Sequence, residues 1–406
     1  MKIVATLPLR IRAEGRYETR DVGLLISALC ELGIDAKLVL IKGHQEITPR
    51  YPWIVPASEE QWKDPGFWRS LEADAMIFNG WAATRFEIER AAMLEACPLL
   101  IEKLDTDGVK SPHIWFGHAL RQASVAWFKT GNPLVDLYRR GRTLVYAFLR
   151  ITFLWLFPSL LYRRMALAMA KVPFHAAETP LACARVERFV TMFGEGADTK
   201  VIHLPHPAND QILSYDCGIP KENVIIAVGR WFHHGKDGKT LLKAADLFLE
   251  THPHWSLVVV GAGEEILRGR WQKMRAKGQV SFAGSLSHAD LKDQYCRAKI
   301  ILVTSHSETF HIASAEALCC GCSVVGPARI PSMSWFASAG SGTTTYRRNP
   351  IGFFDALNAE AGEWERGERD PETISTYWRQ KVGSQAVAEK LLKVVESATG
   401  PNGKRG

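Results

Sequence analysis

Residues 299–326 read KIILVTSHSETFHIASAEALCCGCSVVG, and this stretch decides the fold. The apolar run 300–303 is short enough for a buried strand, and a polar turn follows it. Apolar residues at helical spacing then predict a helix over 310–320, and Gly321 stands where a left-handed residue commonly ends a helix. Residues 322–325 open the next strand. A strand that passes through a turn into a helix presents free backbone N–H groups over the turn, which favours an anion such as phosphate.

Two glutamates frame that turn. Glu308 lies on the loop near the helix start, and Glu316 lies about two turns along the helix, within reach of the ribose of a nucleotide whose phosphates rest on the first turn. The segment 308–321, ETFHIASAEALCCG, resembles the E-x-F-G-x-x-x-x-E-A-x-A-x-G signature of the family 4 retaining glycosyltransferases. The resemblance implies that Glu308 contacts the donor sugar and Glu316 the ribose hydroxyls. The alternative is that both are ordinary solvated helix residues.

One position departs from that signature. His311 stands where the family usually has a glycine, which lets the backbone approach the diphosphate closely. Either the imidazole turns away from the diphosphate, or it contacts phosphate itself. The turn also contains Thr309, Phe310 and Ile312, so the resemblance implies donor contacts along all of 308–312.

A second apolar run, residues 223–229, is typical of a central parallel strand. Arg230 follows it at once, and Lys236 stands six positions later. In the resembled family, a Gly-Arg pair followed by a lysine at this spacing supplies the two cations that hold the donor diphosphate. Fixed cations suit this role because the leaving nucleoside diphosphate gains negative charge as the glycosidic bond breaks. The alternative is that both are surface charges. The resemblance also places Phe282 at a strand end that passes the nucleotide base.

The beginning of the chain reads as strand, helix and strand, with the first strand over 3–6. Such a βαβ opening binds nucleotides or sugars at the carboxyl ends of its strands. Gly15, in the loop after the first strand, resembles the glycine of the family's first loop, which lies near the diphosphate and the acceptor. A single glycine is equally typical of a simple turn.

Asp105 and Asp107 follow the predicted strand 99–104 in an Asp-x-Asp pattern. Two carboxylates on a strand-end turn can share a divalent ion, and this pattern is the manganese signature of the single-domain glycosyltransferases. The later half of the chain favours the metal-free architecture, so we expect neither a metal nor a cofactor beyond a nucleotide-sugar substrate. In the resembled family a histidine lies near the reacting carbon here, and Asp105 or Asp107 is the candidate for an equivalent polar role.

Length and cysteine content bound the class of protein. A chain of 406 residues suggests two domains, and 47% hydrophobic residues suffice for packed cores. Eight cysteines without paired zinc spacing, in a chain whose first residues do not resemble a secretory signal, indicate reduced thiols in a cytoplasmic protein. The cluster at 319–322 is interpreted as small core residues, although a metal site is the alternative.

His203 and His206 are a pair without a third ligand nearby, so they are interpreted as solvent-facing or core histidines.

Positive charge is concentrated in one segment. Residues 121–164 contain eight basic side chains against the single acid Asp136, and this excess of +7 equals the net charge of the whole chain. Such an imbalance indicates an acidic partner. No groove-reading motif accompanies it, which argues against nucleic acid.

The same segment contains an apolar run, residues 143–162, with Arg150 as its only charge. Its length would allow a membrane span, but Pro158, Arg150 and the division of one domain across a bilayer argue against that. Basic residues within 139–164 flank the run, which suits a helix lying in the interface of an anionic leaflet. A helix buried against its own domain is the alternative.

The alternation of strands and helices predicts an α/β protein with two Rossmann-like doubly wound domains facing across a cleft, the GT-B architecture. Residues 1–205 would form an N-terminal acceptor domain with a basic and apolar insert at 121–164. Residues 206–380 would form the C-terminal nucleotide-sugar donor domain, and 381–406 a helix that crosses back, followed by a disordered tail. Residues 201–207 suit a hinge. We expect mostly irregular structure over 47–72, with one helix, and again over 327–357.

The resemblance implies a retaining, metal-independent glycosyltransferase that moves a sugar from a nucleotide-sugar to a glycan or lipid-linked acceptor. Cell-surface polysaccharide or glycolipid biosynthesis is the expected setting, with the protein cytoplasmic or peripheral on the cytosolic face of a membrane. A nucleotide-sugar epimerase of the same architecture and a non-catalytic nucleotide-sugar-binding protein remain alternatives. A nicotinamide oxidoreductase is disfavoured because the first loop lacks G-x-G-x-x-G.

Overall fold

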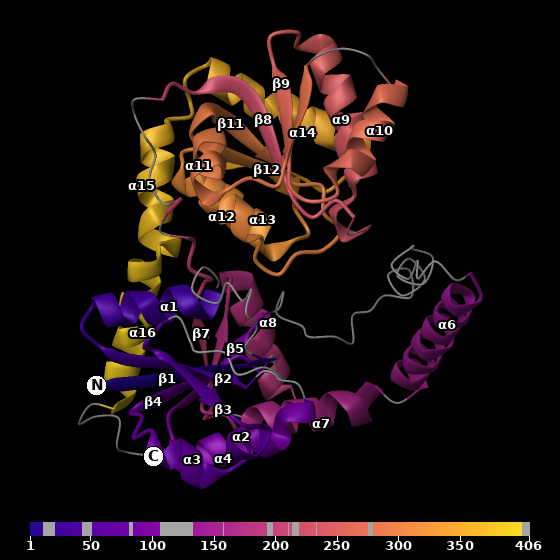
Figure 1. The fold of residues 1–406 in the computed structure, drawn as a ribbon. Coiled ribbons are helices and arrows are strands. Elements are labelled where there is room, and N and C mark those ends of the chain that lie inside the picture. Colours follow the sequence, from indigo (N-terminus) through magenta and orange to yellow (C-terminus); the bar gives the residue numbers. More distant parts are fainter. Residues whose placement is uncertain are drawn as a thin grey trace.

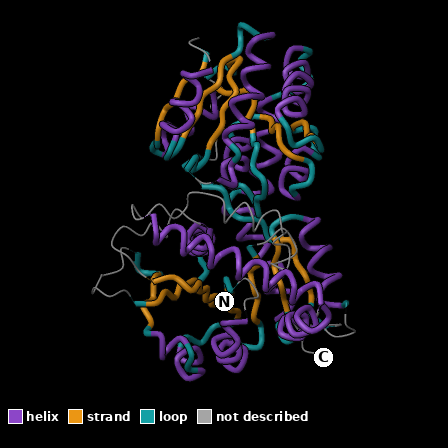
Figure 2. Tube along the Cα trace, turned by 90° about the vertical axis from the view of Figure 1, so that its right-hand side faces the viewer, coloured by secondary structure: helices purple, strands orange, loops and turns teal. Residues whose placement is uncertain are grey.

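Two parallel α/β domains make up the chain (Figure 1). The computed structural model describes residues 1–10, 21–42, 51–80, 84–105, 133–156, 158–192, 198–209, 211–212, 219–232, 234–274 and 279–399. Helices cover both faces of each sheet (Figure 2). The predicted fold class, two Rossmann-like domains, is confirmed.

The N-terminal domain contains a seven-stranded parallel sheet in the order β3-β2-β1-β4-β5-β6-β7. Its strands are β1 (Lys2–Arg10), β2 (Asp35–Ile41), β3 (Ile54–Ala57), β4 (Ala75–Phe78), β5 (Leu100–Leu104), β6 (Phe174–Ala177) and β7 (Lys200–His203). Its helices are α1 (Asp21–Glu31), α2 (Glu59–Trp62), α3 (Pro65–Ser70), the 3-10 turn η2 (Thr84–Phe86), α4 (Glu87–Ala96), α6 (Pro133–Leu156), α7 (Pro158–Ala170) and α8 (Pro180–Thr191).

The C-terminal domain contains a six-stranded parallel sheet in the order β10-β9-β8-β11-β12-β13. Its strands are β8 (Glu222–Val228), β9 (Ser256–Val260), β10 (Val280–Gly284), β11 (Ala298–Leu302), β12 (Ser323–Pro327) and β13 (Gly342–Thr345). Its helices are the 3-10 turn η3 (His234–Lys236), α9 (Gly238–Thr251), α10 (Glu264–Met274), α11 (His288–Arg297), α12 (Ile312–Cys319), α13 (Pro331–Ala337), α14 (Pro350–Glu365) and α15 (Pro371–Val382).

The stretch 299–326 folds as a strand, a turn, a helix and a second strand. Ile300 and Ile301 are fully buried in β11, which pairs with both β8 and β12. Gly321 has a φ of +77°, the left-handed conformation that ends α12, and an added Cβ would lie 2.6 Å from the Pro371 carbonyl oxygen. Cys319, Cys320 and Cys322 are buried in the core of the domain.

A final helix joins the two domains. α16 (Ser384–Thr399) follows α15 and packs against α1 of the N-terminal domain (Figure 1). Its residues Val387, Leu391 and Val395 are buried in the same hydrophobic core as α1. The chain therefore begins and ends its described part in one domain, with the other domain inserted between.

Regular elements replace structure that was expected to be irregular. The described part of this region, residues 51–72, contains one strand, β3, and two short helices, so the prediction of one helix was wrong. β3 contains Pro56 and lies at the edge of its sheet, where a residue without an N–H group is tolerated. The region 327–357 contains α13, with Pro331 at a favoured first position, and the edge strand β13. Residues 201–203, expected in the hinge, lie in β7.

The apolar run 143–162 is divided between two helices. α6 ends at Leu156 and α7 begins at Pro158, because proline cannot donate the next backbone hydrogen bond but suits the first turn of a helix. α6 extends away from the body of the domain (Figure 1). Of the helices in the described ranges, none is long and apolar enough to cross a membrane.

Candidate active site

Two loops meet at the carboxyl edge of the C-terminal sheet. β8 and β11 are neighbours in that sheet, so the loops that follow them leave side by side. The backbone N–H of His306 donates to the Gly235 carbonyl oxygen over 2.7 Å. The Thr304 hydroxyl donates to the Lys236 carbonyl oxygen over 3.0 Å. These bonds fix the loop that contains Lys236 against the turn that contains Glu308.

Lys236 and Glu308 form an ion pair across that contact. The Lys236 Nζ lies 2.7 Å from the Glu308 Oε1, and the two side chains are 21% and 17% exposed. Burial opposes ionisation of Glu308, but the Lys236 ammonium and hydrogen bonds from Lys236 and Ser305 favour the carboxylate, and the pKa of Glu308 is lowered. The carboxylate is therefore ionised at neutral pH and faces a cation at the edge of the sheet.

Arg230 stands at the start of the same loop. Gly229, directly before it, lies against the methylene chain of Lys236, with 3.5 Å between that chain and the position of an added Cβ. An added Cβ on Gly261 would lie 2.0 Å from the Gly229 carbonyl oxygen, so the two backbones touch. Arg230 itself is exposed, and no contact between it and Glu308 is found within the described residues. The structure thus brings Lys236 to Glu308 and leaves Arg230 at the solvent side of their loop.

His311 caps α12 in an unusual conformation. Its φ of +66° lies in the left-handed region, where glycine has no steric penalty. Its Nδ1 lies 2.7 Å from the Ser314 hydroxyl oxygen, so the imidazole is turned back onto its own helix. Burial and the neighbouring Lys236 ammonium lower the pKa of His311 to about 3, so the ring is neutral. The contact with Ser314 occupies Nδ1 in this conformation, and the two alternatives for His311 toward a diphosphate stay predictions.

Glu316 lies on the second turn of α12 and is 8% exposed. The Tyr295 hydroxyl donates to its Oε2 over 3.5 Å. Burial raises the pKa of Glu316 to about 8, although the hydrogen bond from Tyr295 opposes the shift. At neutral pH the carboxyl group is therefore largely protonated when nothing is bound beside it.

The remaining predicted donor contacts lie at several places. Phe310 is buried among aromatic rings, with its centroid 5.4 Å from that of Phe336. Thr309 is half-buried on the turn, and Ile312 begins α12 and packs on the core of the domain. Phe282, on β10, lies under the Arg268 guanidinium, 5.7 Å from ring centroid to cation. The candidates Gly15 and Asp107 lie outside the described residues.

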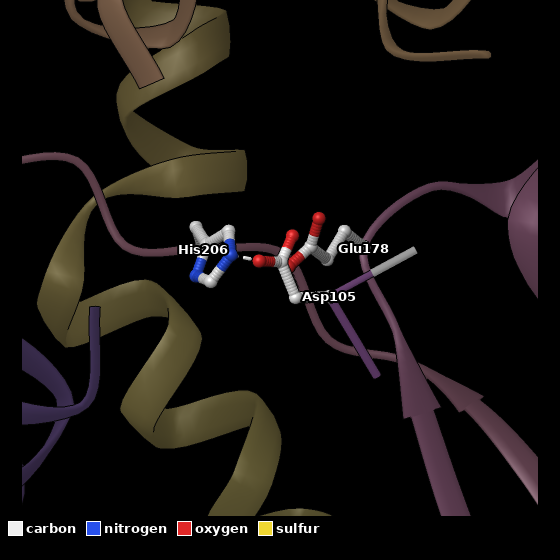
Figure 3. A group of neighbouring side chains, drawn as sticks. All are labelled: Asp105, Glu178 and His206. Atoms are coloured by element: carbon white, nitrogen blue, oxygen red, sulfur yellow. Dashed lines mark ion pairs between the residues drawn. The ribbon is translucent and has the colours of Figure 1, made fainter. Parts of the chain in front are cut away.

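A second polar group lies at the carboxyl edge of the N-terminal sheet (Figure 3). Asp105, Glu178 and His206 follow the adjacent strands β5, β6 and β7. One carboxylate oxygen or ring nitrogen of each, the atoms that could bind a metal ion, all lie within 4.8 Å of one another. His206 Nε2 forms an ion-pair contact with Glu178 Oε1, and His206 Nδ1 lies 3.0 Å from the Lys103 Nζ. Burial raises the pKa of Glu178, and the nearby His206 opposes that shift.

Sequence reasoning found only one member of this group. Asp105 was a candidate through the Asp-x-Asp pattern, while His206 was assigned to solvent or core and Glu178 and Lys103 were not considered. His206 is buried, as the core alternative predicted, but the expectation that no further ligand lies near it was wrong, because its ring nitrogens face Glu178 and Lys103. The available signal was positional: each residue lies at or just after the carboxyl end of a strand, and parallel strands bring those ends together.

Similarity to known proteins was found for the C-terminal domain in sequence and for the whole chain in structure. Residues 216–359 match the protein family described as "Glycosyl transferases group 1". The chain has no match among curated protein sequences.

Solved structures share both domains. The sucrose-phosphate synthase tll1590 from Thermosynechococcus elongatus is 14% identical, with a TM-score of 0.63 over 98% of this chain and 99% of that chain. The Anabaena protein Alr3699/HepE in complex with UDP is 14% identical, with a TM-score of 0.64 over 98% of this chain and 100% of that chain. The apo form of the lipopolysaccharide outer core galactosyltransferase WaaB is 12% identical, with a TM-score of 0.61 over 97% and 99% of the two chains. At these identities the likeness establishes the fold.

Proposed function

We propose that this protein is a glycosyltransferase that follows the family 4 pattern, since residues 216–359 match the group 1 glycosyltransferase family and the whole chain has the two-domain GT-B fold. It takes a sugar from a nucleotide-sugar donor, transfers it with retention of anomeric configuration, and needs no metal. The acceptor is a glycan or a lipid-linked glycan in cell-surface polysaccharide or glycolipid biosynthesis.

The observation that carries this proposal is the pairing of Lys236 with Glu308 beside the start of α12. An incoming diphosphate would meet the half-buried Lys236 ammonium and the first turn of a helix, both favourable to negative charge, and the exposed Arg230 stands on the same loop as Lys236. As the bond to the sugar breaks, charge grows on the leaving phosphate, and these fixed groups stabilise that charge more than they stabilise the ground state. Departure of the leaving group is thus assisted by the chain's own cations.

The two glutamates then have different tasks. Glu308 is ionised and lies at the edge of the sheet, so it accepts hydrogen bonds from sugar hydroxyls and orients the sugar. Glu316, on the second turn of α12, accepts hydrogen bonds from the ribose hydroxyls, and these compensate for the solvent that burial removes from its carboxyl group. Asp105 faces the sugar from the N-terminal domain.

A binding experiment tests the donor site. Purified protein is titrated with uridine, guanosine, adenosine and thymidine diphosphates, with and without manganese, and the thermal midpoint is followed. UDP comes first because a similar structure is in complex with UDP. One diphosphate should raise the midpoint without metal. A shift that requires manganese contradicts the metal-free proposal, and no shift with any diphosphate contradicts the donor site.

Matched lysine variants sharpen the test. Lys236→Met removes the ammonium that faces Glu308, whereas Lys239→Met removes an exposed ammonium three positions later on α9. Only the first variant should lose affinity for the diphosphate, by about tenfold to a hundredfold, since a hydrogen bond to a charged group is worth about 1.5–3 kcal/mol. Equal losses in both would mean that general positive charge, and not this site, binds the nucleotide.

The acceptor is proposed to lie at a membrane because of α6. Large apolar side chains stand exposed along one stripe of this helix, at the spacing of three, four and seven residues that places them on one face. Their exposed fractions range from 39% for Leu144 to 75% for Leu134. The stripe is formed by Leu134, Leu137, Tyr138, Leu144, Val145, Phe148 and Leu149.

The basic side chains on α6 and α7 favour a membrane with anionic lipids. Arg142 on α6 and Arg163 on α7 are exposed, in a segment whose net charge is +7. An apolar stripe with basic side chains near it binds at the surface of an anionic leaflet through both area and charge. The enzyme would thereby meet a lipid-linked acceptor while remaining peripheral.

Vesicle sedimentation tests this partner. The protein should sediment with vesicles of phosphatidylglycerol and phosphatidylcholine and remain free with phosphatidylcholine alone, and salt should weaken binding. A variant with Leu137, Tyr138 and Phe148 changed to Ser should lose at least about tenfold in partitioning, since burying one such side chain is worth about 1.5–3 kcal/mol. Ile351→Ser, at an equally exposed position of the donor domain, is the control. Undiminished binding of the triple variant would contradict the role of α6.

A further inference from the structure

A chain of buried polar side chains reaches from the N-terminal sheet toward the donor turn. Lys103 of β5 is 2% exposed, and its Nζ lies 3.0 Å from His206 Nδ1. The opposite nitrogen of the ring, Nε2, faces the Glu178 carboxylate, which is fully buried. The three residues belong to segments that the sequence separates widely, and the parallel sheet brings them into contact.

The two neighbours of His206 fix the position of its proton. An ammonium group has only donors, so Nδ1 must accept the hydrogen bond from Lys103 with its lone pair. The single ring proton of the neutral imidazole then lies on Nε2, the nitrogen in ion-pair contact with the Glu178 carboxylate. The ring thus links a buried cation, Lys103, to the buried Glu178, and this proximity lowers the cost of burying both charges.

This arrangement disfavours a metal ion at the same place. Asp105, Glu178 and His206 are close enough together to hold one, but an ion would need the lone pair of Nε2. That nitrogen carries the proton as long as Lys103 donates to the other side of the ring. Lys103 therefore supplies the positive charge that a divalent ion would otherwise bring to Glu178.

His206 also touches the other domain. It lies between β7, the last strand of the first sheet, and β8, the first strand of the second. Its ring meets the Phe310 ring edge to face, with 5.5 Å between centroids. Phe310 lies in the donor turn, two residues after Glu308 and directly before His311. Through the contact between His206 and Phe310, the N-terminal sheet therefore supports the turn that contains Glu308.

We propose that His206 is a positioning residue for the transfer reaction: the metal-free Lys103–His206–Glu178 chain holds its ring against Phe310 and so fixes the Glu308 turn relative to Asp105 on the facing domain. This role rests on the proposed function, because Glu308 and Asp105 must meet donor and acceptor at one reacting centre. Placement errors of about 1 Å at such a centre lower rates about a hundredfold.

Two measurements need no substrate. Nitrogen-15 NMR of the wild-type protein at pH 7 should show His206 with a protonated Nε2 and an unprotonated Nδ1. Hydrogen exchange of residues 304–312 should become faster in His206→Ala and stay unchanged in His254→Ala, whose ring is exposed on the donor domain. The opposite tautomer in the wild type, or unchanged exchange in His206→Ala, overturns the proposal even if no donor has been found.

Kinetics and metal content complete the test. With the donor identified, His206→Ala should lower kcat about a hundredfold while the dissociation constant of the nucleoside diphosphate stays within about twofold, because the cations that bind it lie in the other domain. His206→Gln, whose side-chain amide has an NH2 group that can donate and a carbonyl oxygen that can accept, should recover part of kcat. Unchanged kcat in His206→Ala, or a stoichiometric divalent ion in the wild type that Glu178→Gln loses, refutes the proposal. Failure of every diphosphate to bind would refute the proposed function instead.

Discussion

Glu316→Gln should make the unliganded protein more stable, and increasingly so as pH rises. Burial raises the pKa of Glu316 from 4.5 to about 8, so between these values the folded protein holds a proton that the unfolded chain has released. Stability therefore falls with rising pH across this window, and the isosteric amide removes the effect. At about 1.4 kcal/mol per pKa unit, the gain in unfolding free energy is about 1 kcal/mol at pH 5.5 and about 5 kcal/mol at pH 8.5.

Urea titration at a series of pH values measures this difference directly. The two proteins should have similar midpoints near pH 4.5 and should diverge steadily up to pH 8.5. Parallel curves would refute the reasoning, because they would mean that the Glu316 carboxylate ionises in the fold as easily as in the unfolded chain. The same variant should bind the nucleoside diphosphate about tenfold more weakly, since ribose hydroxyls lose a charged acceptor.

Glu308→Gln is the control, because its effect on the free energy of unfolding should have the opposite sign to that of Glu316→Gln. The pKa of Glu308 is lowered, so its carboxylate contributes stability that is present above the pKa of the unfolded chain and is lost as pH falls through the folded value. This variant should be less stable than the wild type at neutral pH, with the difference shrinking in acid. A stabilising Glu308→Gln would mean that burial, and not the ion pair with Lys236, dominates at this site.

Three further predictions concern the loops that build the site. Lys236→Met should leave Glu308 without its cation, so that the pKa of Glu308 rises, which a carboxylate carbon-13 NMR titration would detect. His311→Gly should relieve a left-handed conformation that disfavours a side chain by about 1 kcal/mol, and a thermal midpoint no higher than that of the wild type would contradict this. Gly261→Ala should destabilise the donor domain by more than about 1 kcal/mol in urea, because its Cβ would meet the Gly229 carbonyl oxygen at 2.0 Å, whereas Gly269→Ala, which meets nothing, should not.

The donor half of the site was predictable because its signals are local. Strand, turn and helix follow one another within 299–326, and the left-handed Gly321 ends the helix where the sequence placed its end. The pairing of Lys236 with Glu308 needed one further inference, that β8 and β11 are neighbours, which follows from parallel strand order. What local signals could not decide was the direction of the His311 ring, because that depends on the position of the Ser314 hydroxyl one turn away.

The N-terminal half of the site was not predictable in the same way. In β5, Glu102 pairs with Arg90 on one face of the sheet while Lys103 reaches His206 on the other. Two adjacent charges in a strand look like a solvent-facing edge, and only the strands on either side show that both are buried. Similarly, nothing near residue 206 in the sequence indicates Glu178, because the strand order β5-β6-β7 alone brings them together.

The Lys236–Glu308 pair should also make the affinity for the nucleotide-sugar donor differ from the affinity for the nucleoside diphosphate product. A diphosphate that binds Lys236 competes with Glu308 for the ammonium and leaves a carboxylate that is only 17% exposed. A sugar still attached to the diphosphate offers hydroxyl donors to that carboxylate, whereas the free nucleoside diphosphate product does not, and an unsatisfied buried acceptor costs about 1–3 kcal/mol. We therefore expect the intact donor to bind about tenfold more tightly than the product. In Glu308→Gln that ratio should approach one, as measured by calorimetric titration of both ligands at pH 7; a ratio unchanged from the wild type would show that Glu308 does not face the sugar.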